Sequence, residues 1–322
     1  MKSKFRQIAL LGKYHLNSGS SANPSSRQTI ENIAEFLHTL GCEVILEHDT
    51  AAGTGLSGYP VMRMEEIGKS CDLAIVLGGD GTHRAVALAS GDIPLATLST
   101  GTNNAFPALG EATVVGLAAG LAATGRVMPA CIHNKCLRIT HPGGESMALV
   151  DVGVMPAEHI GARAVYAADA VEAVFAAFAE PDAIGLSAIA AACGPIARTA
   201  PFGRWVRQGA GTARLAAISP GLVQAVDVAA SGLMQPGIAF ELGSKPAILA
   251  LDGEPEIVLD GRGPASVRLA LDGPITLDVA TTLAAAHAAD ALVVTARPEP
   301  ALRDGPPAAP GPTGADRTIA PA

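Results

Sequence analysis

Short apolar runs alternate with amphipathic segments in the first part of the chain. Four runs lack a polar face, which is typical of strands buried on both sides: residues 8–12, 44–46, 73–77 and 93–98. Three further segments repeat apolar residues with helical spacing: residues 25–40, 64–69 and 112–124. Because strands that alternate with helices form parallel sheets, we expect an α/β domain with a Rossmann-like parallel sheet over residues 1–127.

The pattern changes after residue 127. Short segments of strand character, separated by Gly and Pro, follow at residues 137–139, 148–154, 215–218, 223–228, 238–242, 247–251, 267–271 and 275–279. Residues 162–202 interrupt this series with helical patterning, and residues 282–289 have the pattern of a closing helix. We therefore expect a β-rich, sandwich-like domain over residues 128–294 with a helical insertion.

Composition and charge narrow the class of protein. A length of 322 residues exceeds the usual size of one core, which agrees with two domains. The formal net charge of -8, without a compensating basic patch, argues against a nucleic-acid partner and against an anionic membrane surface. The 5 cysteines are scattered, which argues against a disulfide framework or a zinc site and fits a reducing cytosol.

The two ends of the chain add expectations about location. Residues 8–11 form an apolar run that is too short for the core of a signal peptide, and no later stretch reaches the ~18 uninterrupted apolar residues of a membrane span. We expect a cytoplasmic protein that does not enter membranes. Residues 295–322 are rich in Pro and Ala without an apolar period, so we expect a disordered tail.

A glycine-rich loop follows the apolar run at residues 73–77. Gly78, Gly79 and Gly81 allow backbone N–H groups to approach a phosphate, and Thr82 adds a further donor. Asp80 is poorly placed beside a phosphate unless it acts as a base or holds a metal cation, so the loop indicates phosphoryl transfer. A tight turn in which Asp80 caps the next helix remains an alternative.

A second polar loop follows the apolar run at residues 93–98. Because the carboxyl ends of neighbouring parallel strands meet at one edge of a sheet, we expect it to lie beside the first loop. Its small hydroxyl, glycine and amide residues are candidates for binding the nucleotide and its phosphates: Thr100, Gly101, Thr102, Asn103 and Asn104.

These residues carry a family resemblance. The run from Gly78 to Thr82 matches the G-G-D-G-[TS] hallmark of the NAD kinase and diacylglycerol kinase superfamily. Residues 8–82 resemble the amino-terminal half of a bacterial NAD kinase. Residues 99–107 resemble the acetoin catabolism protein X branch and are also similar to the G-T-x-N-D loop of lipid kinases. The resemblance implies an α/β domain followed by a β-rich domain, Asp80 as the catalytic aspartate, ATP and Mg²⁺ as cofactors, and a homo-oligomer.

The resemblance also indicates substrate candidates in the second half. Residues 148–151 resemble an A-L-N-[ED] motif, with Val150 in place of the amide and Asp151 retained. Asp151 is therefore a candidate, although a strand-edge carboxylate that faces water explains it as well. Asp252 and Glu254 resemble the family's D-G-E turn, and a two-residue hairpin is the alternative. Ser187 lies in a weak match to the family's substrate region.

Two positions after the hallmark depart from NAD kinases. His83 and Arg84 replace the usual Met-Leu pair. At the start of a helix, Arg84 is placed to contact a phosphate, and a solvated or capping role is the alternative. The sequence assigns no metal ligands.

The leading hypothesis is an ATP-dependent kinase that phosphorylates the 2′-hydroxyl of NAD to give NADP. Asp80 would take the hydroxyl proton, glycine N–H groups and Mg²⁺ would neutralise phosphate charge, and Asn103 and Asn104 would position the nucleotide. Two alternatives remain open. One is a kinase for another small hydroxylated acceptor, and the other is a non-catalytic protein that binds nucleotides.

Overall fold

The computed structural model describes residues 7–12, 24–101, 103–157 and 170–293. The disordered tail expected at 295–322, Thr102 and the first part of the expected insertion lie outside these residues.

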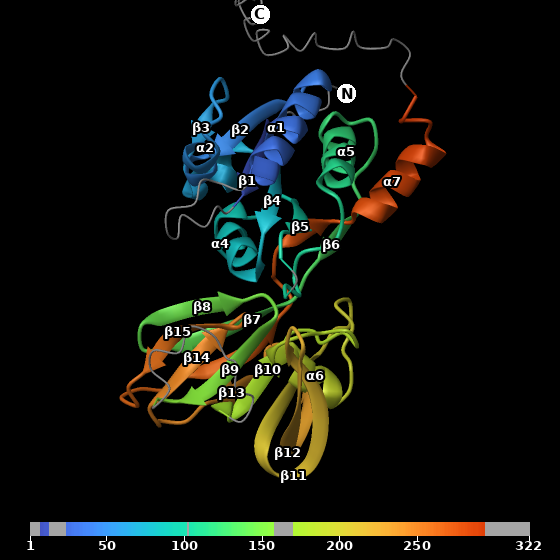
Figure 1. Cartoon of the computed structure of the whole chain (residues 1–322). Coiled ribbons are helices and arrows are strands. Elements are labelled where there is room, and N and C mark those ends of the chain that lie inside the picture. Colours follow the sequence, from blue (N-terminus) through green and yellow to red (C-terminus); the bar gives the residue numbers. More distant parts are fainter. Residues whose placement is uncertain (1–6, 13–23, 102, 158–169, 294–322) are drawn as a thin grey trace, which may run out of the picture. The chain divides into compact units, whose positions relative to one another are not determined.

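The first sheet has seven strands among the described residues, in the order β3-β2-β1-β4-β5-β17-β6 (Figure 1). All neighbours pair in parallel except β6, which runs antiparallel to β17. The predicted parallel sheet is confirmed. The strands are β1 (Gln7–Gly12), β2 (Glu43–Glu47), β3 (Val61–Met62), β4 (Leu73–Gly78), β5 (Leu95–Ser99), β6 (Cys131–His133) and β17 (Ile275–Leu277).

Helices pack on both faces of this sheet. On β1, Ile8 and Leu10 pack with the side of α1 and α5, whereas Ala9 and Leu11 pack with the side of α3 and α4. The strand therefore needs apolar residues at every position, which explains its unbroken apolar run. The helical elements are α1 (Pro24–Thr39), α2 (His48–Thr54), η1 (Met64–Glu66), α3 (Ile67–Ser70), α4 (Asp80–Ser90), α5 (Ala112–Ala123) and α7 (Val279–Ala288).

The remaining strands form two antiparallel sheets among the described residues, in the orders β12-β11-β10-β9-β14-β15 and β13-β16-β7-β8. Side chains of both sheets, such as Leu249 and Val267, share one apolar core, as the predicted sandwich requires. Helix α6 (Leu186–Ala192) covers the other face of the larger sheet. The strands are β7 (Cys136–His141), β8 (Gly144–Ala148), β9 (Asp151–Pro156), β10 (Ala173–Ala176), β11 (Gly203–Ser219), β12 (Leu222–Met234), β13 (Ala239–Glu241), β14 (Ala247–Leu251), β15 (Glu254–Leu259) and β16 (Ser266–Ala270).

Three differences from the sequence predictions concern long-range pairing. The helical prediction for 162–202 is wrong at β10, because these residues pair with β9 and β11. Strands β11 and β12 are far longer than the segments predicted at 215–218 and 223–228. Residues 275–288 were expected in the second domain, but β17 pairs with β5 of the first sheet. None of the described helices has the length and apolar character to cross a membrane.

Candidate functional site

The glycine-rich loop forms a tight turn from β4 into α4. Gly79 is the N-cap in an extended conformation, and Asp80 is the first residue of the helix. A Cβ on Gly78 would lie 2.7 Å from the Thr82 side chain, and one on Gly79 would lie 2.8 Å from Asn104 Oδ1. A larger residue at either position would displace a neighbouring side chain, Thr82 in the first case and Asn104 in the second.

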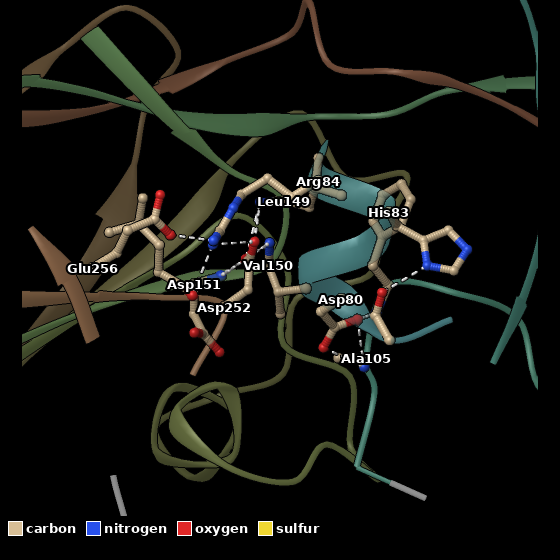
Figure 2. A network of polar contacts seen from close by, with 12 residues as sticks. Asp80, His83, Arg84, Ala105, Leu149, Val150, Asp151, Asp252 and Glu256 are labelled. Carbon is tan, nitrogen blue, oxygen red and sulfur yellow. Dashed lines mark hydrogen bonds and ion pairs between the residues drawn. The ribbon is translucent and has the colours of Figure 1, made fainter. Parts of the chain in front are cut away.

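Asp80 does not cap its own helix, so the capping alternative is wrong. Its Oδ1 accepts hydrogen bonds from the N–H groups of Phe106 (2.8 Å) and Ala105 (3.2 Å), and its Oδ2 accepts from Ala105 (3.0 Å) (Figure 2). Burial raises the pKa of Asp80 to about 6, and the negative charge of Asp252 adds to the rise, while the two backbone donors and Arg198 oppose it. The carboxyl can thus exchange a proton close to neutral pH.

The loop after β5 lies against the first loop, as predicted. Gly78 and Ser99 are register partners at the ends of β4 and β5, and Thr100 N donates to the carbonyl of Gly78 (3.2 Å). Asn104 Nδ2 donates to Ser99 Oγ (2.8 Å), which leaves its Oδ1 beside Gly79. Gly101 and Asn103 lie in the same loop, and Thr102 is outside the described residues.

Asp252 is a structural residue of the hairpin between β14 and β15. Asp252 (φ 51°) and Gly253 (φ 81°) form a two-residue turn with two positive φ angles, so the hairpin alternative is confirmed. The Oδ1 atom of Asp252 accepts from the N–H groups of Leu149 (3.0 Å), Val150 (2.8 Å) and Asp151 (3.3 Å). The carboxylate therefore organises the chain at the start of β9.

Arg84 joins helix α4 to this hairpin (Figure 2). Its Nη1 donates to the carbonyl of Leu251 (2.8 Å) and to Asp252 Oδ2 (3.2 Å), and its Nη2 pairs with Glu256. The Arg84 side chain is only 9% exposed, so the solvated and capping alternatives are wrong. A guanidinium that bridges two carboxylates compensates for the burial of Asp252.

Asp151 lies at the start of β9 and is 4% exposed, so the alternative of a water-facing carboxylate is wrong. Its Oδ1 has no hydrogen-bond partner among the described residues. Burial raises the pKa of Asp151 well above its ordinary value, and the nearby Asp252 and Asp80 raise it further, while the N–H groups of Ser187 and Gly253 oppose the rise. Burial and the neighbouring carboxyls therefore favour the protonated form of Asp151.

The other substrate candidates differ in their surroundings. Ser187 is buried, and its hydroxyl donates to the carbonyl of Ile184 (3.1 Å) while its N–H supports Asp151. Glu254 Oε2 lies 3.2 Å from the place that a Cβ on Gly81 would occupy, next to the first turn of α4. Val150 is 1% exposed in the core of the sandwich and does not offer a group to a ligand.

Arg198 is a site residue that no sequence motif indicated. Its Nη1 and Nη2 donate to the carbonyls of Phe106 (2.8 Å) and Ala105 (2.7 Å), the residues whose N–H groups bind Asp80. Its guanidinium also lies over the ring of Phe178, 4.3 Å from the centroid. Arg198 and Asp80 therefore hold the same two residues, Arg198 through their carbonyls and Asp80 through their N–H groups. A single arginine in an Ala-rich segment carried no signal for this role.

His83 is a buried residue of helix α4, and its ring contacts other groups of the protein. Its Nδ1 lies 2.8 Å from the Gly79 carbonyl oxygen, and burial lowers its pKa to about 4. The imidazole is therefore neutral at physiological pH, and it packs against Phe106.

A cavity of about 270 Å³ adjoins these groups. Its lining includes Asn104, Ala105, Ser187, Arg198, Glu180 and Asp182. Ala105 belongs to both features, because it lines the cavity and donates its N–H to Asp80. Among the described residues, no group of three His, Cys, Asp or Glu side chains is arranged to hold a metal ion.

Comparisons with known proteins divide the chain in the same way as the fold. Residues 17–127 match the ATP-NAD kinase N-terminal domain, and residues 135–272 match the Acetoin catabolism protein X C-terminal domain. Acetoin catabolism protein X of Cupriavidus necator is 40% identical over 238 residues, which are 70% of this chain and 66% of that protein. The NAD kinase of Paracidovorax citrulli is 46% identical over 103 residues, which are 31% of this chain and 35% of that protein.

Two solved structures share the fold. Yeast NADH kinase complexed with NADH has a TM-score of 0.58 at 13% identity, covering 85% of this chain and 83% of that chain. An NAD kinase from Archaeoglobus fulgidus in complex with ATP has a TM-score of 0.52 at 12% identity, covering 89% of this chain and all of that one.

The amino-terminal part of the chain is similar to NAD kinases in sequence, as the sequence resemblance predicted, and the fold is that of NAD kinase structures. The second half is similar to the carboxyl-terminal domain of acetoin catabolism protein X. The matched stretches span just under two thirds of the acetoin protein and about one third of the NAD kinase.

Proposed function

We propose that this protein is a phosphotransferase that moves a phosphoryl group from ATP to an alcohol. The observation that carries the proposal is the position of Asp80, directly after the glycine turn, with a pKa of about 6. Such a carboxyl is largely ionised at neutral pH and still basic enough to accept a proton from a reacting hydroxyl.

Different groups of the site bind the phosphates and accept the proton. The N–H groups at Gly79 and Gly81 and the amino-terminal end of α4 bind phosphate oxygens. The acceptor oxygen forms a bond to the γ-phosphorus, the bond from that phosphorus to the bridging oxygen of ATP breaks, and ADP leaves. The acceptor proton goes to Asp80, and Arg198 keeps the backbone around it in place.

Mg²⁺ enters this proposal as part of the Mg·ATP substrate. Mg²⁺ commonly binds through substrate phosphates and only one or two carboxylates, so the lack of a three-ligand group in the described residues does not conflict with that role. We assign no step to an ion held by the protein itself.

NAD is the first acceptor to test, because the amino-terminal half is similar to NAD kinases. Purified protein with ATP, Mg²⁺ and NAD should form NADP, and Asp80→Asn should reduce the rate by a factor of about 10² or more. Asp92→Asn, an exposed aspartate just beyond α4, is the matched control and should keep the wild-type rate. NADP formation at the same rate by wild type and Asp80→Asn would refute the role of Asp80.

A second acceptor class is favoured by the position of Val150. The A-L-N-[ED] pattern has an amide here, whereas Val150 lies in the apolar core and leaves this contact unmade. A small hydroxylated acceptor is therefore the alternative to NAD. An ATP-consumption screen of polyols tests it, with Asp80→Asn as the blank.

Calorimetry with ATP, combined with the acceptor screen, separates both kinase hypotheses from the hypothesis of a non-catalytic protein. A nucleotide-binding accessory protein would bind ATP with no turnover of any acceptor in the screen. Absence of ATP binding would refute all three.

A further inference from the structure

The cavity beside Asp80 has a lining that selects for ligand charge. We propose that it binds a small acceptor that is rich in hydroxyl or ammonium donors and carries no negative charge, with Glu180 and Asp182 as the selecting residues. This inference rests on the proposed phosphotransferase and names the substrate class of the same site.

The size of the cavity suits a small acceptor. Its volume of about 270 Å³ lies just below the ~300–1,000 Å³ of pockets that enclose drug-sized ligands. The space is therefore suited to a small molecule such as an open-chain sugar alcohol, which it can enclose more fully than a dinucleotide.

The polar groups of the lining are mainly hydrogen-bond acceptors. Asn104 donates one of its two amide N–H groups to Ser99 Oγ, so its oxygen can accept a hydrogen bond and its second N–H can donate one. The Ser187 hydroxyl donates to the carbonyl of Ile184, which leaves its oxygen to accept as well. Glu180 and Asp182 add two carboxylates. A ligand must therefore supply the donors, and hydroxyl and ammonium groups do so.

The lining has one cation against two carboxylates. Arg198 donates from Nη1 and Nη2 to the carbonyls of Phe106 and Ala105, and its face covers Phe178, so only its remaining N–H groups are available to a ligand. An anionic ligand would lose its hydration next to two carboxylates and would gain only this one partly used guanidinium. A cationic ligand gains from the same two charges, so the affinity should increase as the ligand charge becomes more positive.

The cavity is also placed for transfer. Ala105 lines it and donates its N–H to Asp80, so one residue links the cavity to the proposed base. Transfer therefore requires the acceptor hydroxyl to bind at the Ala105 end of the cavity.

Calorimetry on the full chain tests the proposal with three molecules that share a six-carbon skeleton. They are glucamine (positive), sorbitol (neutral) and gluconate (negative). We expect glucamine to bind tightest and gluconate weakest, with glucamine at least about tenfold tighter than gluconate, because two carboxylates act on each charge. Gluconate binding as tightly as glucamine, or no binding by any of the three, would overturn the proposal.

Variants that remove one carboxylate charge test whether the cavity causes the preference for positive ligands. Glu180→Gln and the exposed Asp182→Asn should each weaken glucamine binding by about threefold to fivefold and leave sorbitol within about twofold. Glu172→Gln, an exposed glutamate outside the lining, is the matched control and should change none of the three affinities. An equal loss of glucamine affinity in all three variants would contradict the roles of Glu180 and Asp182. An unchanged glucamine affinity in the two cavity variants would contradict them as well.

Binding and turnover are measured separately, so the two proposals fail in different ways. If glucamine and sorbitol bind in the expected order but no acceptor is phosphorylated by ATP, the phosphotransferase is refuted and the binding site stands. If NADP forms while the three polyols do not bind, the phosphotransferase stands and the acceptor class is refuted.

Discussion

Asp80 exchanges its proton near pH 6, and this value leads to a prediction about rate. The carboxyl must be ionised to accept a proton, so kcat/KM should rise with pH and level off above an apparent pKa of about 6. A pH–rate profile between pH 5 and 8, with the acceptor that proves active, measures it. A rate that is flat across this range would mean that Asp80 is not the base.

Asp151 allows a prediction about stability. Its pKa is raised in the folded state, so the native protein keeps a proton that the unfolded chain has lost, and stability falls as pH rises above the ordinary Asp value. Asp151→Asn mimics the protonated form and removes this loss. The melting temperature of the variant relative to wild type should therefore increase between pH 5 and pH 8. A constant difference would show that Asp151 is ionised in the folded protein.

Helix α4 and the β14–β15 hairpin are joined by the buried Arg84. Arg84→Met leaves Asp252 buried without its guanidinium and should cost about 3–5 kcal/mol of unfolding free energy. The matched control is Arg63→Met, because Arg63 pairs with Glu66 at a largely exposed position and should cost less than about 1 kcal/mol. Urea denaturation measures both. Equal effects would mean that the buried pair contributes no more than a surface pair.

The first sheet depends on residues from the far end of the chain. Leu277 of β17 packs in its core, and Ala286 of α7 packs with Leu121 and Val127 next to α5. A fragment of residues 1–127 lacks all three elements β6, β17 and α7, so it exposes this apolar surface and should not fold cooperatively. Circular dichroism and thermal melting check this.

A chain that ends at residue 293 is the control, because every element named above precedes that residue. It should melt as the full chain does. A fragment 1–127 with a cooperative melting transition would show that the first 127 residues are an independent domain.

The local pattern of the sequence was sufficient for strands β1, β2, β4 and β5 and for the place of the phosphate loop. Unbroken apolar runs identified the strands of a sheet buried on both faces, since each side of β1 meets helices. Glycines at 78 and 79 marked the turn, because a Cβ at either position would meet the side chain of Thr82 or Asn104. Apart from the contact with Asn104, these features depend on neighbours within a few residues, which a sequence pattern records.

Only the tertiary structure decided which residues complete the site around Asp80. Arg198 binds Phe106 across 92 positions, and Arg84 binds Asp252 across 168. It also decided that Asp252 supports the backbone and that Asp151 is buried. A sequence pattern reports local periodicity, whereas these partners and the pKa shifts that they cause arise from chain closure and burial, which bring together residues with no local relation.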